Sequence, residues 1–243
     1  SFFFITLAGV ALWLFIKNII NRKILIPVLA LLILWDLAAV DKSYLNDKNF
    51  SSKKEAQNPY PATQADMAIL EDKDPDYRVL NIAVNTFNEA STSYYHMSIG
   101  GYHAAKLRRY QELIDAHIDG NIEHIKNAFR NNPTQQSIDS TLKQQGVLNM
   151  LNTRYIIYNP EAPPLHNAAA LGNAWFVGDV KMAKNADEEL KFSGEINPAT
   201  TAVVDERYKE QFTGYVPKNE SNGTIKLTDY KANDLKYQST SNQ

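Results

Sequence analysis

The chain contains no cysteine among its 243 residues. This absence excludes disulfides, thiolate catalysis and zinc or iron-sulfur sites built on cysteine. The chain also has no large excess of charge of either sign, because its 25 Lys and Arg residues nearly balance its 27 Asp and Glu residues and the formal net charge is only -2. No overall basic field therefore attracts nucleic acid, and no acidic excess indicates a disordered tail. The sequence also lacks a nucleophile elbow, a P-loop and a dinucleotide-binding motif. We predict no cofactor and no nucleic-acid partner, so other partners must be inferred from local patterns.

Two long apolar runs stand at the start of the chain. Residues 1–16 are apolar apart from Ser1 and Thr6, and residues 24–40 are apolar apart from Asp36. Each run falls somewhat short of the roughly 20 residues that cross a bilayer, and the first begins abruptly, so we expect the chain to be a piece of a longer protein. We predict a transmembrane hairpin of two helices over residues 1–41. The alternatives are a cleaved signal peptide or a buried hairpin, but a signal peptide has one such run behind a leading charge.

The charges around the two runs predict which side of the membrane each part faces. Lys17, Arg22 and Lys23 lie in the short connection, whereas Asp41 and Asp47 lie beyond the second run. Because cytoplasmic loops are enriched in Lys and Arg, the connection should lie in the cytoplasm. We therefore expect the bacterial cytoplasmic (inner) membrane, with the residues after about Asp41 on the periplasmic or exterior side.

The remainder of the chain mixes helical and strand patterns, which predicts an α+β extracytoplasmic domain over residues 42–192. A β-rich, sandwich-like part should begin within residues 193–243 and be cut short there. The expected helices cover residues 64–71, 107–120, 121–130, 136–151 and 187–191, with Gly120 ending the second of them. The expected strands cover residues 77–84, 154–158, 174–182, 200–205, 223–230 and 235–240.

The run 93–111 is the most informative part of the sequence. It combines aromatic residues, two histidines, three cations and the pair Gly100 and Gly101, which permit backbone conformations or close approaches that a side chain forbids. The cations lie near a predicted helix N-terminus, where the helix dipole favours a negative charge instead. A bound phosphate or carboxylate would resolve this conflict.

We take seven residues of this run as candidate substrate-binding residues: Tyr95, His96, Tyr102, His103, Lys106, Arg108 and Arg109. The cations would meet the anion, with the arginines suited to phosphate, and the tyrosines would offer a stacking surface. The alternative for the cations is internal pairing with the acidic residues at 71–76 or with Glu112. The alternative for the histidines is a hydrogen-bonded place in the core rather than acid or base chemistry.

One cluster of aspartates and one pair of histidines contain residue types that bind metals, but neither matches a known metal motif well. Asp72, Asp74 and Asp76 match the first ligands of a calcium loop, yet Tyr77 occupies the place of its turn glycine. His117 and His124 are seven residues apart, which matches no strong metal motif. We predict no metal site.

Several strings along the chain together resemble the extracytoplasmic domain of YfhO-type bacterial membrane proteins, especially the form found in Bacteroidetes. Within the run 93–111 the resemblance rests on residues 92–96, 98–102 and 106–111. The supporting strings, in order along nearly the whole chain, are residues 40–46, 58–60, 77–80, 147–155, 172–177 and 201–205.

The resemblance implies a polytopic membrane protein related to GT-C glycosyltransferases. Such a protein would transfer a sugar from a polyprenyl-phosphate carrier to a glycan of the cell envelope. Its catalytic acid would lie in an exterior loop near the first membrane helices, so we expect no catalytic residue in this chain. The alternative is a non-catalytic periplasmic module, anchored in the membrane, that binds a glycan or a protein.

Overall fold

The computed structural model describes residues 2–130, 133–214 and 223–241. By compactness the chain divides into two units, Ser1–Pro59 and Tyr60–Gln243. Each unit is a separate body and is described by itself. The predicted domain boundaries at residues 41 and 192 stay predictions.

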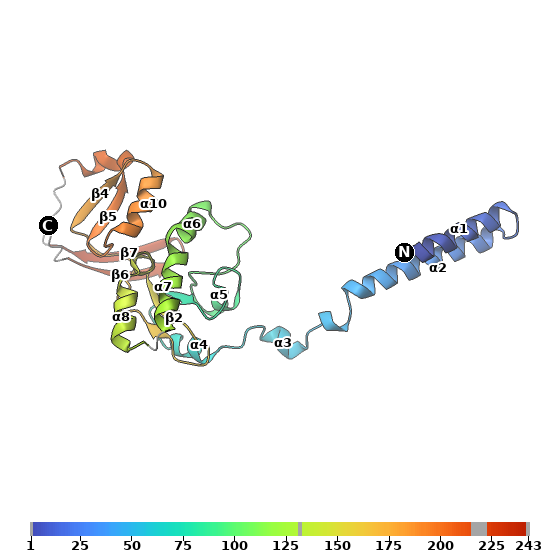
Figure 1. Cartoon of the computed structure of the whole chain (residues 1–243), viewed down its shortest axis with the longest axis horizontal. Coiled ribbons are helices and arrows are strands. Elements are labelled where there is room, and N and C mark those ends of the chain that lie inside the picture. The colour runs from blue at the N-terminus through green and yellow to red at the C-terminus, as the bar shows by residue number, and fades with distance from the viewer. Residues whose placement is uncertain (1, 131–132, 215–222, 242–243) are drawn as a thin grey trace. The chain divides into compact units, whose positions relative to one another are not determined.

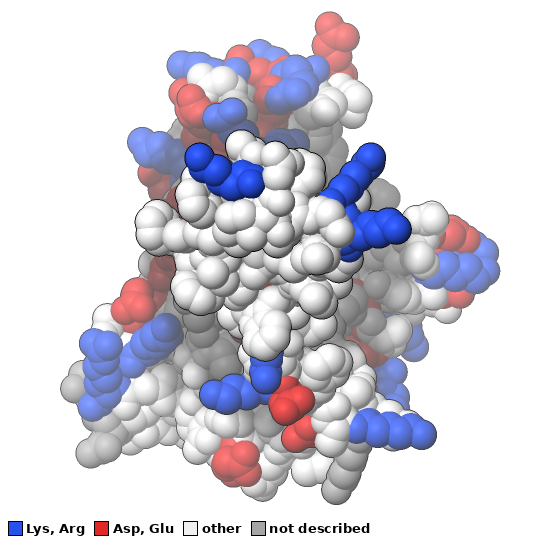
Figure 2. Space-filling model, turned by 90° about the vertical axis from the view of Figure 1, so that its right-hand side faces the viewer, with Lys and Arg blue, Asp and Glu red and all other residues white. Residues whose placement is uncertain are grey.

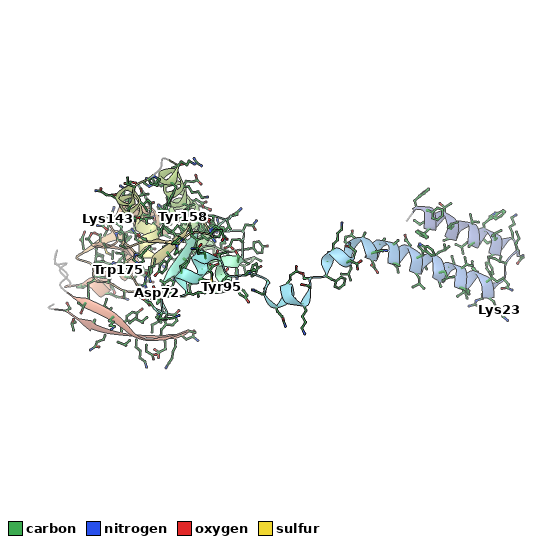
Figure 3. All side chains as sticks on the ribbon, turned by 90° about the horizontal axis from the view of Figure 1, so that it is seen from below. Lys23, Asp72, Tyr95, Lys143, Tyr158 and Trp175 are labelled. Atoms are coloured by element: carbon green, nitrogen blue, oxygen red, sulfur yellow. The ribbon has the colours of Figure 1, made fainter. Side chains whose placement is uncertain are left out.

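The first unit contains two apolar helices that lie side by side, α1 (Phe2–Ile16) and α2 (Arg22–Tyr44) (Figure 1). The Asn21 side chain accepts a hydrogen bond from the backbone N–H of Ile24 at 3.1 Å and so caps α2. Lys23 lies at the turn end of the pair (Figure 3). Two short helices follow, η1 (Asp47–Asn49) and α3 (Lys53–Gln57).

Only one helical stretch of the described residues, Arg22–Asn49, is long and apolar enough to cross a membrane. The 15 residues of α1 rise only about 22 Å, less than the thickness of a bilayer core. Large apolar side chains of α2 face outward, including Trp35 at 71% exposed. Figure 2 views this unit from its turn end, as a mostly white surface with Lys and Arg side chains at its edge. The coarser prediction of a long apolar helix near the N-terminus is therefore confirmed, and the hairpin of two spanning helices stays a prediction.

The second unit mixes helices with three small sheets. Its helices are α4 (Gln64–Ile69), α5 (Ser91–Tyr95), α6 (Arg108–Leu113), the π-helical segment η2 (Ile114–Ile118), α7 (Asp119–Phe129), α8 (Gln135–Lys143), α9 (Gly146–Met150), α10 (Ala186–Glu195) and η3 (Glu206–Phe212). Its strands are β1 (Arg78–Asn81), β2 (Thr153–Ile157), β3 (Leu165–His166), β4 (Asp179–Ala183), β5 (Thr201–Asp205), β6 (Thr224–Lys231) and β7 (Asp234–Thr240). This confirms the mixed α and β class.

The sheets follow the local sequence patterns. Strand β1 pairs with β2 in parallel and β2 with β3 antiparallel, while β4 and β5 form a parallel pair. The strands predicted at residues 223–230 and 235–240 are confirmed as β6 and β7, which pair antiparallel as a hairpin around the turn at residues 232–233. The predicted strand at 174–182 begins only at Asp179. The sandwich-like arrangement of the C-terminal part stays a prediction, since the described sheets have two or three strands each.

Strands β1 and β2 each carry two adjacent apolar residues that are buried on opposite faces of the sheet, Val79 with Leu80 and Ile156 with Ile157. Neighbouring residues of β1 point to opposite faces, so Val79 packs in one apolar cluster with Ile69 of α4. Leu80 packs in the other, which is built mainly by the helices. The larger cluster comprises Leu80, Ile99, Ile114, Ile118, Ile122, Ile125, Ile138, Leu142, Val147, Leu148 and Ile156.

The predicted end of a helix at Gly120 is wrong. The helix that begins at Arg108 runs without a break through η2 and continues past Gly120 to Phe129. Its core residues from Tyr110 to Ile122 recur every fourth position, which is more than the 3.6 residues of an α-helical turn. The wider π turn takes up the difference and keeps Ile114, Ile118 and Ile122 on one face. Gly120 has open space around it, so nothing requires the chain to stop there.

Candidate functional site

The Gly100–Gly101 pair holds the run 93–111 against the loop that follows β1, through both a close approach and an unusual backbone conformation of the kind that glycine permits. A Cβ added to Gly100 would lie 1.9 Å from the carbonyl oxygen of Thr86. Gly101 has a φ of 105°, which side chains rarely allow, and its N–H donates to the same Thr86 carbonyl at 2.7 Å. The pair therefore fixes the directions of the two halves of this run, residues 93–99 before the glycines and residues 102–111 after them.

The first half of the run points into the domain. The His96 side chain is only 1% exposed, and its Nε2 lies 2.9 Å from Oδ1 of Asp66, whose side chain is 10% exposed. Asp66 also accepts hydrogen bonds from the backbone N–H and hydroxyl of Thr63 at 2.9 and 2.7 Å. Burial raises the pKa of the Asp66 carboxyl, but the hydrogen bonds from Thr63 and His96 outweigh it and leave the pKa below its usual value.

The same half binds the start of the second unit. The hydroxyl of Tyr95, labelled in Figure 3, donates to the carbonyl of Tyr60 at 2.5 Å. The ring of Tyr94 lies 5.5 Å from that of Tyr60 and 4.9 Å from that of Tyr95, each measured between ring centroids. Tyr95 and His96 thus hold the chain where it joins this unit.

The second half of the run points into solvent. Tyr102 is 68% exposed, and the side chains of Arg108 and Arg109 are 92% and 81% exposed. The Nε of Arg108 donates to Glu112 at 2.8 Å, as the pairing alternative predicted, whereas Arg109 lies 3.7 Å from a carboxylate oxygen of Glu189. The Nζ of Lys106 lies 5.1 Å from the centroid of the Phe87 ring.

A shallow recess of about 240 Å³ lies between Phe87, in the loop that follows β1, and the second half of the run 93–111. It is lined by Phe87, Gly100, Gly101, His103, Ala105, Lys106, Leu107 and Tyr110. The structure thus gathers His103 and Lys106 at one recess and separates them from His96. Substrate binding by the seven candidates stays a prediction.

A larger cleft, of about 540 Å³, lies elsewhere in the second unit. One wall is the turn that contains Asp74 and Asp76, together with Arg154 of β2, and the other wall belongs to the hairpin β6–β7. Arg154 donates to Asp72 at 3.1 Å through Nη1 and to Asp74 at 2.7 Å through Nη2. Asp72, labelled in Figure 3, lies in this turn before β1.

The acidic turn holds itself in shape. The backbone N–H of Asp74 donates to a carboxylate oxygen of Asp72 at 2.9 Å, and that of Asp76 donates to Asp74 at 3.1 Å. Burial raises the pKa of the Asp76 carboxyl, and the nearby charge of Asp74 adds to the shift. The hydroxyl of Tyr155 donates to Asp72 at 2.9 Å, and burial together with this hydrogen bond raises the pKa of Tyr155 to about 12.

The hairpin contributes two tyrosines and a cation to the facing wall, namely Tyr230, Tyr237 and Lys226. The hydroxyl of Tyr230 also lies 3.7 Å from the sulfur of Met97, which brings the hairpin to the residue after His96. The cleft therefore offers carboxylates, a guanidinium, an ammonium and two aromatic faces in one space. Such a lining suits a ligand that carries many hydroxyl groups on an apolar ring.

The sequence pattern indicates the acidic turn but not the cleft that the turn lines. The spacing of Asp72, Asp74 and Asp76 matches the first ligands of a calcium loop, but the described residues include no group of three or more acidic, histidine or cysteine side chains that could hold a metal. The pairing of Arg154 with this turn joins residues about 80 positions apart, which no local pattern reveals. The alternation of apolar and polar residues in β6 signalled a strand but not the surface that it faces.

Comparisons with protein-family models, with curated proteins and with solved structures found no match to this chain.

Proposed function

We propose that this chain is a membrane-anchored module that binds a glycan in the cleft between the acidic turn and the hairpin β6–β7. The observation that carries the proposal is the facing of Asp74, Asp76 and Arg154 with Tyr230 and Tyr237. Carboxylates and guanidinium groups form paired hydrogen bonds with neighbouring sugar hydroxyls, and a tyrosine ring packs on the C–H face of a sugar.

We further propose that the parent protein is a GT-C-like membrane glycosyltransferase, as the YfhO-type resemblance implies. In this proposal the sugar comes from a polyprenyl-phosphate carrier, the acceptor is an envelope glycan, and a carboxylate elsewhere in the protein acts as base. The apolar stretch Arg22–Asn49 supports the membrane location. In the same proposal the membrane is the bacterial inner membrane and the second unit lies on its periplasmic side. Two spanning helices and a sandwich-like C-terminal region are parts of the same proposal.

The cleft proposal is tested with the full chain in detergent on an array of neutral and amino-sugar oligosaccharides from bacterial envelopes. We expect at least one of them to bind with a Kd below about 1 mM. Tyr237→Ala should weaken that binding about tenfold, because a stacked ring contributes on the order of 1.4 kcal/mol. Tyr237 is 37% exposed, so its loss should leave the fold intact.

Tyr208→Ala is the matched control, because Tyr208 is 47% exposed and does not line the cleft. Equal affinities of the two variants would contradict glycan binding in this cleft, as would the absence of any binding on the array.

A further inference from the structure

The loop that follows Gly101 presents two large apolar side chains to solvent. Tyr102 is 68% exposed and Leu107 is 78% exposed. The start of the loop is firmly held, since the N–H of Tyr102 donates to the carbonyl of Glu89 at 2.8 Å beside the contacts of Gly101. Single exposed apolar residues are common on proteins, but a tyrosine and a leucine on one loop, beside cations, form a small amphipathic surface.

The cations of this surface are available to an outside anion. The side chains of Arg108 and Arg109 are more than 80% exposed, and their partners Glu112 and Glu189 are 46% and 32% exposed. Ion pairs in such contact with water contribute little stability, so they exchange readily for phosphate oxygens. The N-terminal turn of α6 contains no acidic residue that would hold these cations in place.

The loop lies on the side of the unit where the connection from the anchor arrives. A Cβ on Gly101 would lie 3.4 Å from the hydroxyl oxygen of Ser93 in α5, and α5 carries Tyr94 and Tyr95, which contact Tyr60. Tyr60 is the first residue of the second unit. The ten residues between Asn49 and Tyr60 reach at most about 40 Å, so in an anchored chain Tyr60 stays within that distance of the end of the apolar stretch.

We propose that residues 101–109, which comprise the loop after Gly100 and the first two residues of α6, form a membrane-docking segment. Tyr102 and Leu107 enter the headgroup region of the bilayer, while Lys106, Arg108 and Arg109 contact the phosphates of anionic lipids. Tyrosine favours this depth because its ring is apolar and its hydroxyl is polar, and each cation near an anionic surface adds to the binding. The proposal rests on the membrane anchor proposed above and not on glycan binding in the cleft.

The absence of cysteine gives a clean test, because one introduced cysteine takes one label. Leu107→Cys is labelled with an environment-sensitive nitrobenzoxadiazole group in the full chain, which is incorporated into nanodiscs of phosphatidylglycerol and phosphatidylcholine. Leu235→Cys, on the exposed strand β7 and 48% exposed, is the matched control. Lipids that carry a nitroxide at the headgroup should quench the label of Leu107→Cys severalfold more than the label of Leu235→Cys.

Equal quenching of the two labels would overturn the proposal. Co-elution of the chain with nanodiscs tests the anchor separately, and the oligosaccharide array tests the cleft separately. Changing Lys106, Arg108 and Arg109 to Gln should weaken docking about fivefold for each charge removed, and less so in nanodiscs of phosphatidylcholine alone. If the label of Leu107→Cys responds to inorganic phosphate at constant ionic strength but not to the quenching lipids, the cations form a site for soluble anions instead and membrane docking is wrong.

Discussion

Replacing Gly100 by alanine is expected to lower the free energy of unfolding of the second unit by about 3 kcal/mol or more. The added Cβ would lie 1.9 Å from the Thr86 carbonyl oxygen and 2.7 Å from the Thr86 Cγ2. The first of these atoms is backbone, so no change of rotamer relieves the clash. The Thr86 hydroxyl also donates to the Asn81 carbonyl at 2.8 Å, which ties this loop to the end of β1. Urea unfolding of the full chain, followed by near-ultraviolet circular dichroism, measures the loss.

Gly120→Ala is the matched control for Gly100→Ala. Gly120 lies within a continuous helix, and a Cβ added to it would meet no atom within 4 Å, so alanine should raise the free energy of unfolding by about 0.5–1 kcal/mol. A Gly100→Ala variant as stable as the wild type would show that the loop after β1 does not hold the run 93–111 as described.

Replacing His96 by alanine is expected to destabilise the second unit by about 2–3 kcal/mol at neutral pH. The change removes a hydrogen-bond partner from a carboxylate whose side chain is 10% exposed, and it leaves a cavity beside α4. The hydrogen bonds from Thr63 remain, so the loss should stay below that of a fully unpaired buried charge. Thermal unfolding of the two proteins at equal concentration measures the difference.

His103→Ala is the control for His96→Ala, because His103 is exposed and lies outside the core, and it should change stability by less than about 0.5 kcal/mol. His96→Gln, which keeps a donor, should recover part of the lost stability. If His96→Ala leaves stability unchanged but lowers envelope glycosylation by the complete protein, His96 is an acid or base rather than a structural residue.

The pairing of Asp66 with His96 should make the stability of the second unit depend on pH. Because the pKa of Asp66 is lowered in the folded protein, its contribution is complete above the unfolded pKa of about 4. The contribution is lost as the pH falls through the lower folded pKa. We expect His96→Ala to weaken this acid dependence, since removal of the histidine moves the folded pKa of Asp66 back toward its unfolded value. Unfolding curves measured from neutral to acidic pH check it, and an unchanged acid slope would contradict the pairing.

Local patterns predicted most of the elements of the second unit. The strand pattern before residue 84 appears as β1, and the apolar and polar alternation near the C-terminus appears as the hairpin β6–β7. The helix expected at 136–151 is instead two helices, because the chain turns at Gln144 and Gln145. The wrong helix end at Gly120 has a physical reason. Glycine lowers helix propensity only by about 1 kcal/mol, and the burial of Ile118, Ile122 and Ile125 outweighs it.

The candidate site was predictable only in part. The sequence singled out Gly100, Gly101 and the cations after them, and the glycine contacts confirm why no side chain fits there. It could not separate His96 from His103, because the two residues differ only in which side of the glycine turn they occupy. Burial beside Asp66 or exposure to solvent follows from packing against α4, an element some 30 residues earlier in the chain.

The sequence by itself determined the apolar helix near the N-terminus, the mixed α and β character and the unusual run 93–111, because each depends on residues that are close together in the chain. Only the tertiary structure decided that one half of this run holds the domain together while the other half faces solvent. It also decided that Asp72 and Asp74 meet Arg154 opposite the tyrosines of a hairpin. Those contacts join distant segments, and the burial that fixes them arises only when the segments pack.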